Sequence, residues 1–287
     1  MKGPINFALN HITAPRHSCR VFVDLAAQLG CAGIELRNDL DDKQLTDRPF
    51  FDGEKPVEIG EYVRSKGIRL LGLSEVYGFN KWSEEMQGKT ASLIDQAKQA
   101  GAESISLIPS NDGENLADAT RLDNLRRALS SILPMLDATN MTALVEPLGF
   151  TTSSLRYKRE AIEAIFAVKG ENHFKLVHDT FHHFLAGERE FFPDQTGIVH
   201  ISGVADPMVT PEAMRDGHRI LVTTEDRLGN IDQIRALRES GYSGSYSYEC
   251  FAAAVHASPN LERELQASIK LVESELHAAA QPDVIAK

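Results

Sequence analysis

Short apolar segments rich in Ile, Val and Leu alternate with longer amphipathic segments along nearly the whole chain. The short segments predict eight strands, at residues 5–10, 33–37, 69–74, 104–109, 141–147, 174–179, 197–203 and 245–250. The longer segments predict helices over residues 19–29, 57–66, 84–100, 121–136, 158–168, 231–240 and 259–277. Strands that alternate with helices pair in parallel. Eight such units predict an α/β fold, a single closed (β/α)8 TIM barrel.

Glycines mark the ends of four of these helices: Gly30, Gly67, Gly101 and Gly241 each follow the last amphipathic residue. A glycine at this position ends a helix because it adopts a positive φ without steric strain. These glycines therefore support the predicted helix boundaries.

The length suits one barrel, because a (β/α)8 barrel takes about 250 residues and the chain has 287. No linker or shift in composition divides it. We expect the barrel to occupy residues 1–278, and residues 279–287 to form a frayed tail. Two connections are long, residues 38–56 after the second strand and residues 204–229 after the seventh. Such loops often carry active-site contacts at the C-terminal rim of a barrel.

Composition limits the classes of protein to consider. Hydrophobic residues make up 42% and charged residues 25%, which is ordinary for a soluble globular protein. The formal net charge of −11 argues against binding of nucleic acid by a basic face. The three cysteines form no pair motif, which suits a cytoplasmic location. We expect neither a signal peptide nor a membrane span, because the N-terminal apolar run is short and no run reaches about 20 residues.

Four predicted strands end in an acidic residue or a histidine: Glu146, Asp179, His200 and Glu249. In a parallel barrel the C-terminal ends of the strands share one rim, so these four side chains could converge. Three carboxylates and one imidazole suit Mn²⁺, Mg²⁺ or Co²⁺, and the histidine also allows Zn²⁺. We therefore predict that the four residues bind one divalent metal ion.

A metal ion of this kind could bind two neighbouring oxygens of a hydroxy-ketone and stabilise the enediolate formed from it. Glu146 and Glu249 are the predicted acid and base, since a carboxylate beside the substrate can move a proton between carbons. His182 follows Asp179 by three residues and is predicted to contact a substrate hydroxyl. Arg219, in the long loop after the seventh strand, is a further candidate for substrate binding.

The alternation of side chains along a strand predicts which of the remaining polar residues point away from the site. His178 and Cys250 should point away from the site, because each is adjacent to a predicted ligand. Asn10, Glu35 and Arg37 lie at the ends of the first two strands, where they could line the pocket. Alternatively, Glu35 and Arg37 could pair with each other.

Several expected motifs of other enzyme classes are absent from the sequence. No lysine lies at the end of a predicted strand, which disfavours a Schiff-base aldolase. The segments after the seventh and eighth strands lack the glycine-rich turn of a barrel phosphate site. Neither a P-loop nor a dinucleotide-binding GxGxxG motif is present. We therefore expect a neutral, hydroxyl-rich small-molecule substrate and no organic cofactor.

Four stretches resemble the xylose isomerase-like barrel superfamily, and within it the inosose isomerase group of inositol catabolism. These stretches are ALVEPLG at 143–149, LVHDTFHHFLAG at 176–187, VHISGVAD at 199–206, and residues 225–241. The resemblance implies one metal held by Glu146, Asp179, His200 and Glu249, with the two glutamates as acid and base. It also implies that His182 and Arg219 bind substrate.

Two positions depart from the ketose 3-epimerases of this superfamily. Those enzymes carry a glutamate six residues after the first metal glutamate and an arginine six residues after the metal histidine. Here these positions are Thr152 and Asp206. The differences favour a cyclic polyol ketone over a ketohexose.

The leading hypothesis is therefore an isomerase that moves a carbonyl between adjacent carbons of a keto-inositol. A dehydratase or epimerase on the same scaffold is the alternative. A DNA-repair endonuclease would need more histidines and carboxylates on the early strands, which offer few beyond Glu35 and Glu75. A non-catalytic polyol-binding barrel would have no need of two glutamates on a metal. A homo-oligomer is compatible with the sequence, although no interface is identified.

Overall fold

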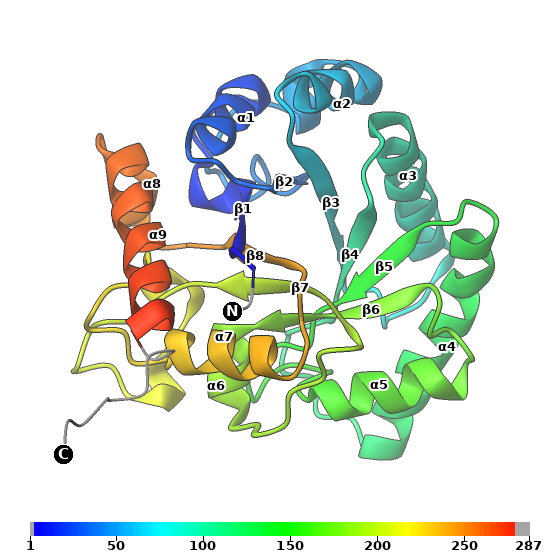
Figure 1. Cartoon of the computed structure of the whole chain (residues 1–287). Coiled ribbons are helices and arrows are strands. Elements are labelled where there is room, and N and C mark those ends of the chain that lie inside the picture. Colours follow the sequence, from blue (N-terminus) through cyan, green and yellow to red (C-terminus); the bar gives the residue numbers. More distant parts are fainter. Residues whose placement is uncertain (1–2, 279–287) are drawn as a thin grey trace.

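The computed structural model describes residues 3–278, which form a closed barrel of eight strands (Figure 1). Each strand pairs in parallel with the next, and β8 pairs with β1 to close the ring. The strands are β1 Asn6–Asn10, β2 Gly33–Arg37, β3 Arg69–Tyr77, β4 Ser104–Ile108, β5 Thr142–Val145, β6 Phe174–Asp179, β7 Thr196–Ile201 and β8 Ser245–Tyr248. The predicted (β/α)8 barrel is confirmed.

The helices surround the strands (Figure 1). They are α1 Cys19–Gln28, α2 Pro56–Ser65, α3 Glu84–Ala100, α4 Asp118–Asp137, α5 Lys158–Ala167, α6 Thr180–Ala186, α7 Asn230–Glu239, α8 Ala253–His256 and α9 Leu261–Ala278. Short 3₁₀ helices lie at His11–Thr13, Phe50–Gly53, Pro211–Ala213 and Asp216–His218. At the end of α3, Gly101 has φ 72°, as its predicted role requires. None of the helices over residues 3–278 is both long and apolar enough to cross a membrane.

The main difference from the predicted elements is α6, a helix of seven residues between β6 and β7. It is too short for amphipathic periodicity to reveal it. Asp179 caps its start by accepting a hydrogen bond from the His182 amide at 2.9 Å. Gly187 ends it with φ 66°. Asp179 therefore has a structural role that the sequence did not indicate. The predicted tail, residues 279–287, lies outside the described residues.

The interior of the barrel contains an apolar layer of five buried side chains: Ala8, Leu71, Leu144, Val177 and Ile198. Successive side chains of a strand point to opposite faces, so residues two apart share a face. Leu144, Val177 and Ile198 each precede a predicted metal ligand by two residues. The layer thus forms an apolar floor beneath the C-terminal rim. The larger core lies between the strands and the helices.

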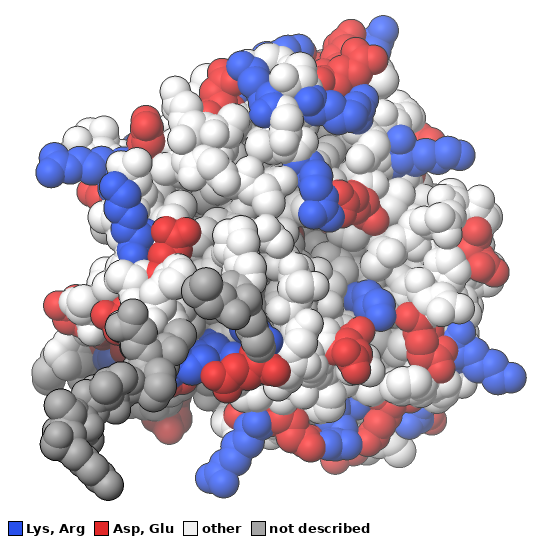
Figure 2. All heavy atoms as spheres, in the orientation of Figure 1, with Lys and Arg blue, Asp and Glu red and all other residues white. Residues whose placement is uncertain are grey.

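The surface carries acidic and basic side chains in mixed order. Figure 2 shows Lys and Arg interspersed with Asp and Glu over the face in view. Ion pairs on the protein surface include Arg69 with Glu103 and Arg20 with Glu54. The face in view therefore presents no continuous basic area of the kind that a nucleic-acid groove requires.

The packing of α2 against α3 predicts opposite effects for two helical glycines. A Cβ on Gly60 would lie 1.8 Å from the Ala100 carbonyl oxygen, whereas a Cβ on the exposed Gly88 meets no atom within 4 Å. Gly60→Ala should lower the free energy of unfolding by about 1–3 kcal/mol through overpacking. Gly88→Ala should raise it by about 0.4–1 kcal/mol, because alanine restricts the unfolded chain. Urea denaturation measures both, and equal effects would contradict the close helix contact.

Candidate metal centre

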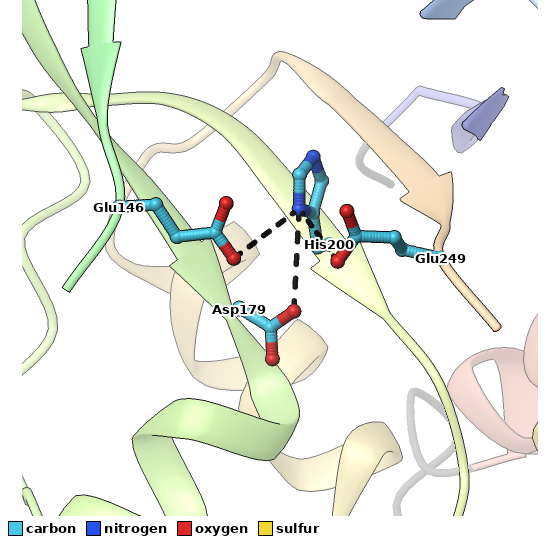
Figure 3. A group of neighbouring side chains, drawn as sticks. All are labelled: Glu146, Asp179, His200 and Glu249. Carbon is cyan, nitrogen blue, oxygen red and sulfur yellow. Dashed lines mark ion pairs between the residues drawn. The ribbon is translucent and has the colours of Figure 1, made fainter. Parts of the chain in front are cut away.

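The four predicted ligands meet at the C-terminal rim of the barrel. Glu146 directly follows β5, Asp179 is the last residue of β6, His200 lies near the end of β7, and Glu249 directly follows β8. All four are buried, and one ligand atom from each lies within 4.8 Å of the others. Figure 3 shows Glu146 and Glu249 on opposite sides of the His200 ring, with Asp179 between them. The geometry therefore brings together side chains from four successive strands.

We call Glu146, Asp179, His200 and Glu249 the carboxylate cluster, and the distances within it fit one cation. His200 Nδ1 lies 3.2 Å from Glu249 Oε2, 3.7 Å from Glu146 Oε1 and 4.0 Å from Asp179 Oδ2. Ligands at about 2.1 Å from an octahedral ion are separated by about 3.0 Å when adjacent and about 4.2 Å when opposite. His200 Nδ1 has no hydrogen-bond partner among the described residues. The donor set and its spacing thus fit a divalent ion.

Burial and mutual repulsion separate the pKa values of the two glutamates. Burial, together with the negative charge of Glu249, raises the pKa of Glu146 to about 7. Burial also acts to raise the pKa of Glu249, but the positive charges of His200, Arg219 and Arg37 outweigh it and hold that pKa well below its usual range. Glu146 is therefore the carboxyl that can change protonation near neutral pH, whereas Glu249 stays ionised.

The carboxylates also act on His200. Burial acts to lower the pKa of His200, but Glu249, Glu35 and Glu146 together raise it well above its ordinary value. In protein without a cation, the ring is therefore protonated. The cluster stabilises positive charge at Nδ1, which is the charge that a divalent ion would supply there.

Arg219 lies inside the cluster rather than on the surface. Its Nη2 donates to Asp179 Oδ2 at 2.5 Å and to Glu249 Oε2 at 2.8 Å, and its Nε donates to Ser202 Oγ at 3.0 Å. The guanidinium also contacts the rings of Phe181 and Phe251, at 5.1 and 4.7 Å from the ring centroids. Arg219 thus holds two predicted ligands, and substrate binding by Arg219 stays a prediction.

Arg37 holds Glu249 from the other side. Its Nη1 donates to Glu249 Oε1 at 3.0 Å, and its Nε and Nη2 donate to Asp39 at 2.8 and 2.7 Å. Nη2 also donates to Glu75 at 3.0 Å, while Asn10 Nδ2 donates to Glu249 Oε1 at 3.3 Å. Asn10 and Arg37 therefore contact the cluster. This agrees with the expectation that they line the pocket, rather than with a pair between Glu35 and Arg37. The contribution of Asp39 was missed, although it follows Arg37 by only two residues.

Glu35 does not pair with Arg37. Its side chain is fully buried, and Oε2 lies 3.1 Å from His200 Nε2. Instead of the pair with Arg37 that sequence proximity suggested, Glu35 contacts His200 across the interior of the barrel, from β2 to β7.

His182 is placed where the sequence predicted, just after Asp179 on α6. Its ring packs edge-on against Phe150 and Phe181, at centroid distances of 5.1 and 5.3 Å. Burial lowers the pKa of His182, so the ring is neutral, and its Nδ1 has no hydrogen-bond partner among the described residues. A neutral imidazole with an unpaired ring nitrogen can hydrogen-bond a hydroxyl group.

His178 and Cys250 point away from the cluster, as strand alternation predicted. His178 Nε2 lies 3.0 Å from Gln233 on α7, and its ring stacks on Phe191. Cys250 Sγ donates to the Ile220 carbonyl. Both side chains belong to the packing between strands and helices.

A rim cavity of about 320 Å³ lies among the loops after β5 and β7. Its lining residues are Asn111, Gly149, Phe150, Thr151, Thr152, Arg156, Leu185, Pro211, Glu212, Met214, Arg215 and Asp216. Two contacts connect it with the carboxylate cluster: Asp216 accepts a hydrogen bond from Arg219, and Phe150 packs against His182. The long loop 204–229 was predicted to supply substrate contacts, but the contribution of the loop after β5 was not.

The chain belongs to the xylose isomerase-like TIM barrel family, whose model matches residues 23–274. A comparison with curated protein sequences gave no match. Among solved structures, a xylose isomerase domain-containing protein from Salmonella typhimurium is 29% identical, with a TM-score of 0.84. The match covers 96% of this chain and 100% of that one.

Two further structures show the same fold at lower identity. The IolI protein, solved with a bound zinc atom, is 17% identical with a TM-score of 0.81, and the match covers 96% of this chain and 99% of that one. A D-psicose 3-epimerase from Clostridium cellulolyticum is 16% identical with a TM-score of 0.68, covering 95% and 99%. The match to the family model confirms the resemblance of the sequence to this superfamily.

The pKa of Glu146 predicts a pH-dependent effect in metal-free protein. Because folding raises this pKa from 4.5 to about 7, the stability that Glu146 contributes is fully present below pH 4.5 and is lost as the pH rises through 7. Glu146→Gln should therefore gain stability relative to wild type between pH 5 and 8. Urea midpoints in the presence of a chelator measure this difference. A difference independent of pH would contradict the buried, repelled carboxyl.

Proposed function

We propose that this protein is a metal-dependent isomerase that moves a carbonyl between adjacent carbons of a keto-inositol or a similar unphosphorylated polyol ketone. The observation that carries this proposal is the carboxylate cluster, in which two glutamates lie on opposite sides of the His200 ring and could hold one cation. A bound Mn²⁺, Co²⁺, Mg²⁺ or Zn²⁺ ion would polarise the substrate carbonyl and stabilise the negative charge of an enediolate. Glu146, Asp179, His200 and Glu249 would hold it.

The two glutamates can divide the proton transfer between them. Glu146 is the proposed first proton carrier, because a carboxylate beside the substrate carbon can take a proton from it and return it. Glu249 lies on the other side, as Figure 3 shows, but is held ionised by Arg37 and Arg219. We assign Glu249 as the second proton carrier, because an ionised carboxylate beside the substrate can accept a proton.

Two side chains are suited to bind the substrate hydroxyls. His182 offers an unpaired, neutral ring nitrogen beside the cluster. Arg219 offers donors next to the same carboxylates. The rim cavity of about 320 Å³ is large enough for one six-membered polyol ring, at the small end of ligand sites. No phosphate-binding glycine loop accompanies it in the sequence, so we propose an unphosphorylated substrate.

An epimerase or dehydratase is the second candidate. The fold that this chain shares with D-psicose 3-epimerase supports this alternative. The ketose 3-epimerases that this chain resembles carry a glutamate where Thr152 stands. In the structure, Thr152 lines the rim cavity and donates to Asn111 Oδ1 at 2.6 Å. A hydroxyl replaces the expected carboxylate on the cavity wall, and this difference is why we rank the keto-inositol isomerase first.

Further proposals concern the catalytic domain, the cellular location and the partners of the protein. We propose that residues 1–278 form the single catalytic domain and that the enzyme acts in the cytoplasm, in inositol catabolism. Its partner is the small-molecule substrate rather than nucleic acid or a membrane, and a homo-oligomer remains compatible with the fold.

Proton NMR of 2-keto-myo-inositol in D₂O tests the proposed reaction directly. With metal-loaded enzyme we expect a new keto-inositol, carrying either deuterium at a carbon beside the carbonyl or a proton transferred between the two carbons. Chelator treatment should abolish the change, and Glu146→Gln should slow it by about 10²–10⁴-fold. Formation of a diketone would move the assignment to a dehydratase. An unchanged spectrum with Mn²⁺, Co²⁺ and Zn²⁺ would refute the keto-inositol assignment.

The assignment of His182 predicts a selective effect on substrate binding. His182→Ala should raise KM about tenfold, because one hydrogen bond to the substrate is lost. The matched control is His173→Ala, since His173 precedes β6 at the opposite end of the same strand, where it pairs with Asp137. Steady-state kinetics with both variants measure the difference. Equal KM values in the two variants would argue against substrate contact by His182.

A further inference from the structure

His200 presents its two ring nitrogens to two different environments. Nδ1 faces the candidate cation site, with Glu249, Glu146 and Asp179 within 4.0 Å. Nε2 lies on the other edge of the ring, 3.1 Å from Glu35 Oε2. The two edges of one ring therefore contact carboxylates with different partners.

The side chain of Glu35 has one polar contact. Glu35 lies on β2 and is fully buried, and its side chain makes no other hydrogen bond among the described residues, where Oε1 is without a partner. Arg37, two residues later, bonds instead to Asp39, Glu75 and Glu249. A carboxylate buried without a cation or a metal is costly unless it accepts a strong hydrogen bond. The contact with His200 is the one that the structure supplies.

The chemistry of the imidazole ring connects this contact with metal binding. A neutral ring carries one N–H donor and one lone pair, and the hydrogen bond of one nitrogen decides which nitrogen is free. If Nε2–H donates to Glu35, the lone pair lies on Nδ1 and points at the carboxylate cluster. A carboxylate behind a ligating histidine also fixes the ring orientation and increases its basicity.

We propose that Glu35 is a positioning residue for His200: it holds the Nε2–H tautomer and the ring orientation in which Nδ1 binds the metal. This inference rests on the proposed metal site. It adds Glu35 on β2 to the residues that support four predicted ligands drawn from β5 to β8. Glu35 touches neither the candidate cation position nor the rim cavity, so it acts through His200 alone.

Zinc affinity provides the first test, measured by competition with a chromophoric chelator. Glu35→Ala should weaken zinc binding about 10–100-fold, the range typical for removal of such a partner. Glu35→Gln should weaken it less, because the amide oxygen still accepts a hydrogen bond from Nε2–H. The control is Ser247→Ala on β8, since Ser247 is equally buried and its hydroxyl has no hydrogen-bond partner among the described residues. That variant should bind zinc within about twofold of wild type, well below the 10–100-fold loss expected when a partner of the histidine is removed.

Nitrogen NMR provides a readout that a purely structural role would not change. In zinc-loaded protein labelled with ¹⁵N-histidine, the ring signals of His200 are identified by their loss in His200→Gln. Wild type should show zinc on Nδ1 and a slowly exchanging Nε2–H proton shifted downfield by the carboxylate. In Glu35→Ala that proton should move upfield or exchange rapidly with water.

The outcomes separate this inference from the proposed function. If wild type binds no zinc, both fail. If wild type binds zinc and Glu35→Ala binds it equally tightly with an unchanged Nε2–H signal, only the role of Glu35 is overturned, even if the melting temperature falls. If Glu35→Ala does not fold, Glu35→Gln decides: unchanged zinc affinity together with an unchanged Nε2–H signal overturns the role, and a loss of several-fold supports it.

Discussion

The repulsion between buried carboxylates is the constraint on which the whole site depends. Glu146, Asp179 and Glu249 share a space a few ångströms wide above an apolar floor, where like charges interact strongly. The structure offsets their charge with Arg219 and with the protonated His200, while Glu146 retains a raised pKa. A divalent ion would replace the proton on His200. The same electrostatics favour a cation within the cluster and, in metal-free protein, leave Glu146 as the carboxyl that changes protonation near neutral pH.

Much of the barrel could be predicted because its elements follow from local sequence patterns. The strands at 33–37 and 174–179 and the helix at 84–100 match the predicted bounds, since each has a clear period and clear end signals. The convergence of the four ligands could also be predicted, because strand order in a parallel barrel places all C-terminal strand ends at one rim. The seven-residue α6 escaped prediction, since its N-cap is Asp179, itself a predicted ligand, and the helix is too short to show a period.

The partners of the ligands could not be predicted, because they depend on contacts between distant strands. Glu35 and Arg37 are two residues apart, and local reasoning offered a mutual ion pair. In the barrel, however, Glu35 reaches His200 across 165 positions of sequence, and Arg37 reaches Glu249 across 212. The alternation of side chains along a strand indicated that these residues point into the barrel. It did not indicate which strand their side chains would contact. Such contacts follow from barrel closure and strand register, which a single sequence does not specify.

Anomalous diffraction at the zinc absorption edge, from crystals grown with zinc, tests directly whether the carboxylate cluster binds a metal ion. We expect one strong peak at the C-terminal rim, about 2.0–2.2 Å from His200 Nδ1 and from one oxygen each of Glu146, Asp179 and Glu249. A peak bound elsewhere, or no peak at the carboxylate cluster, would contradict a metal centre built from these four residues.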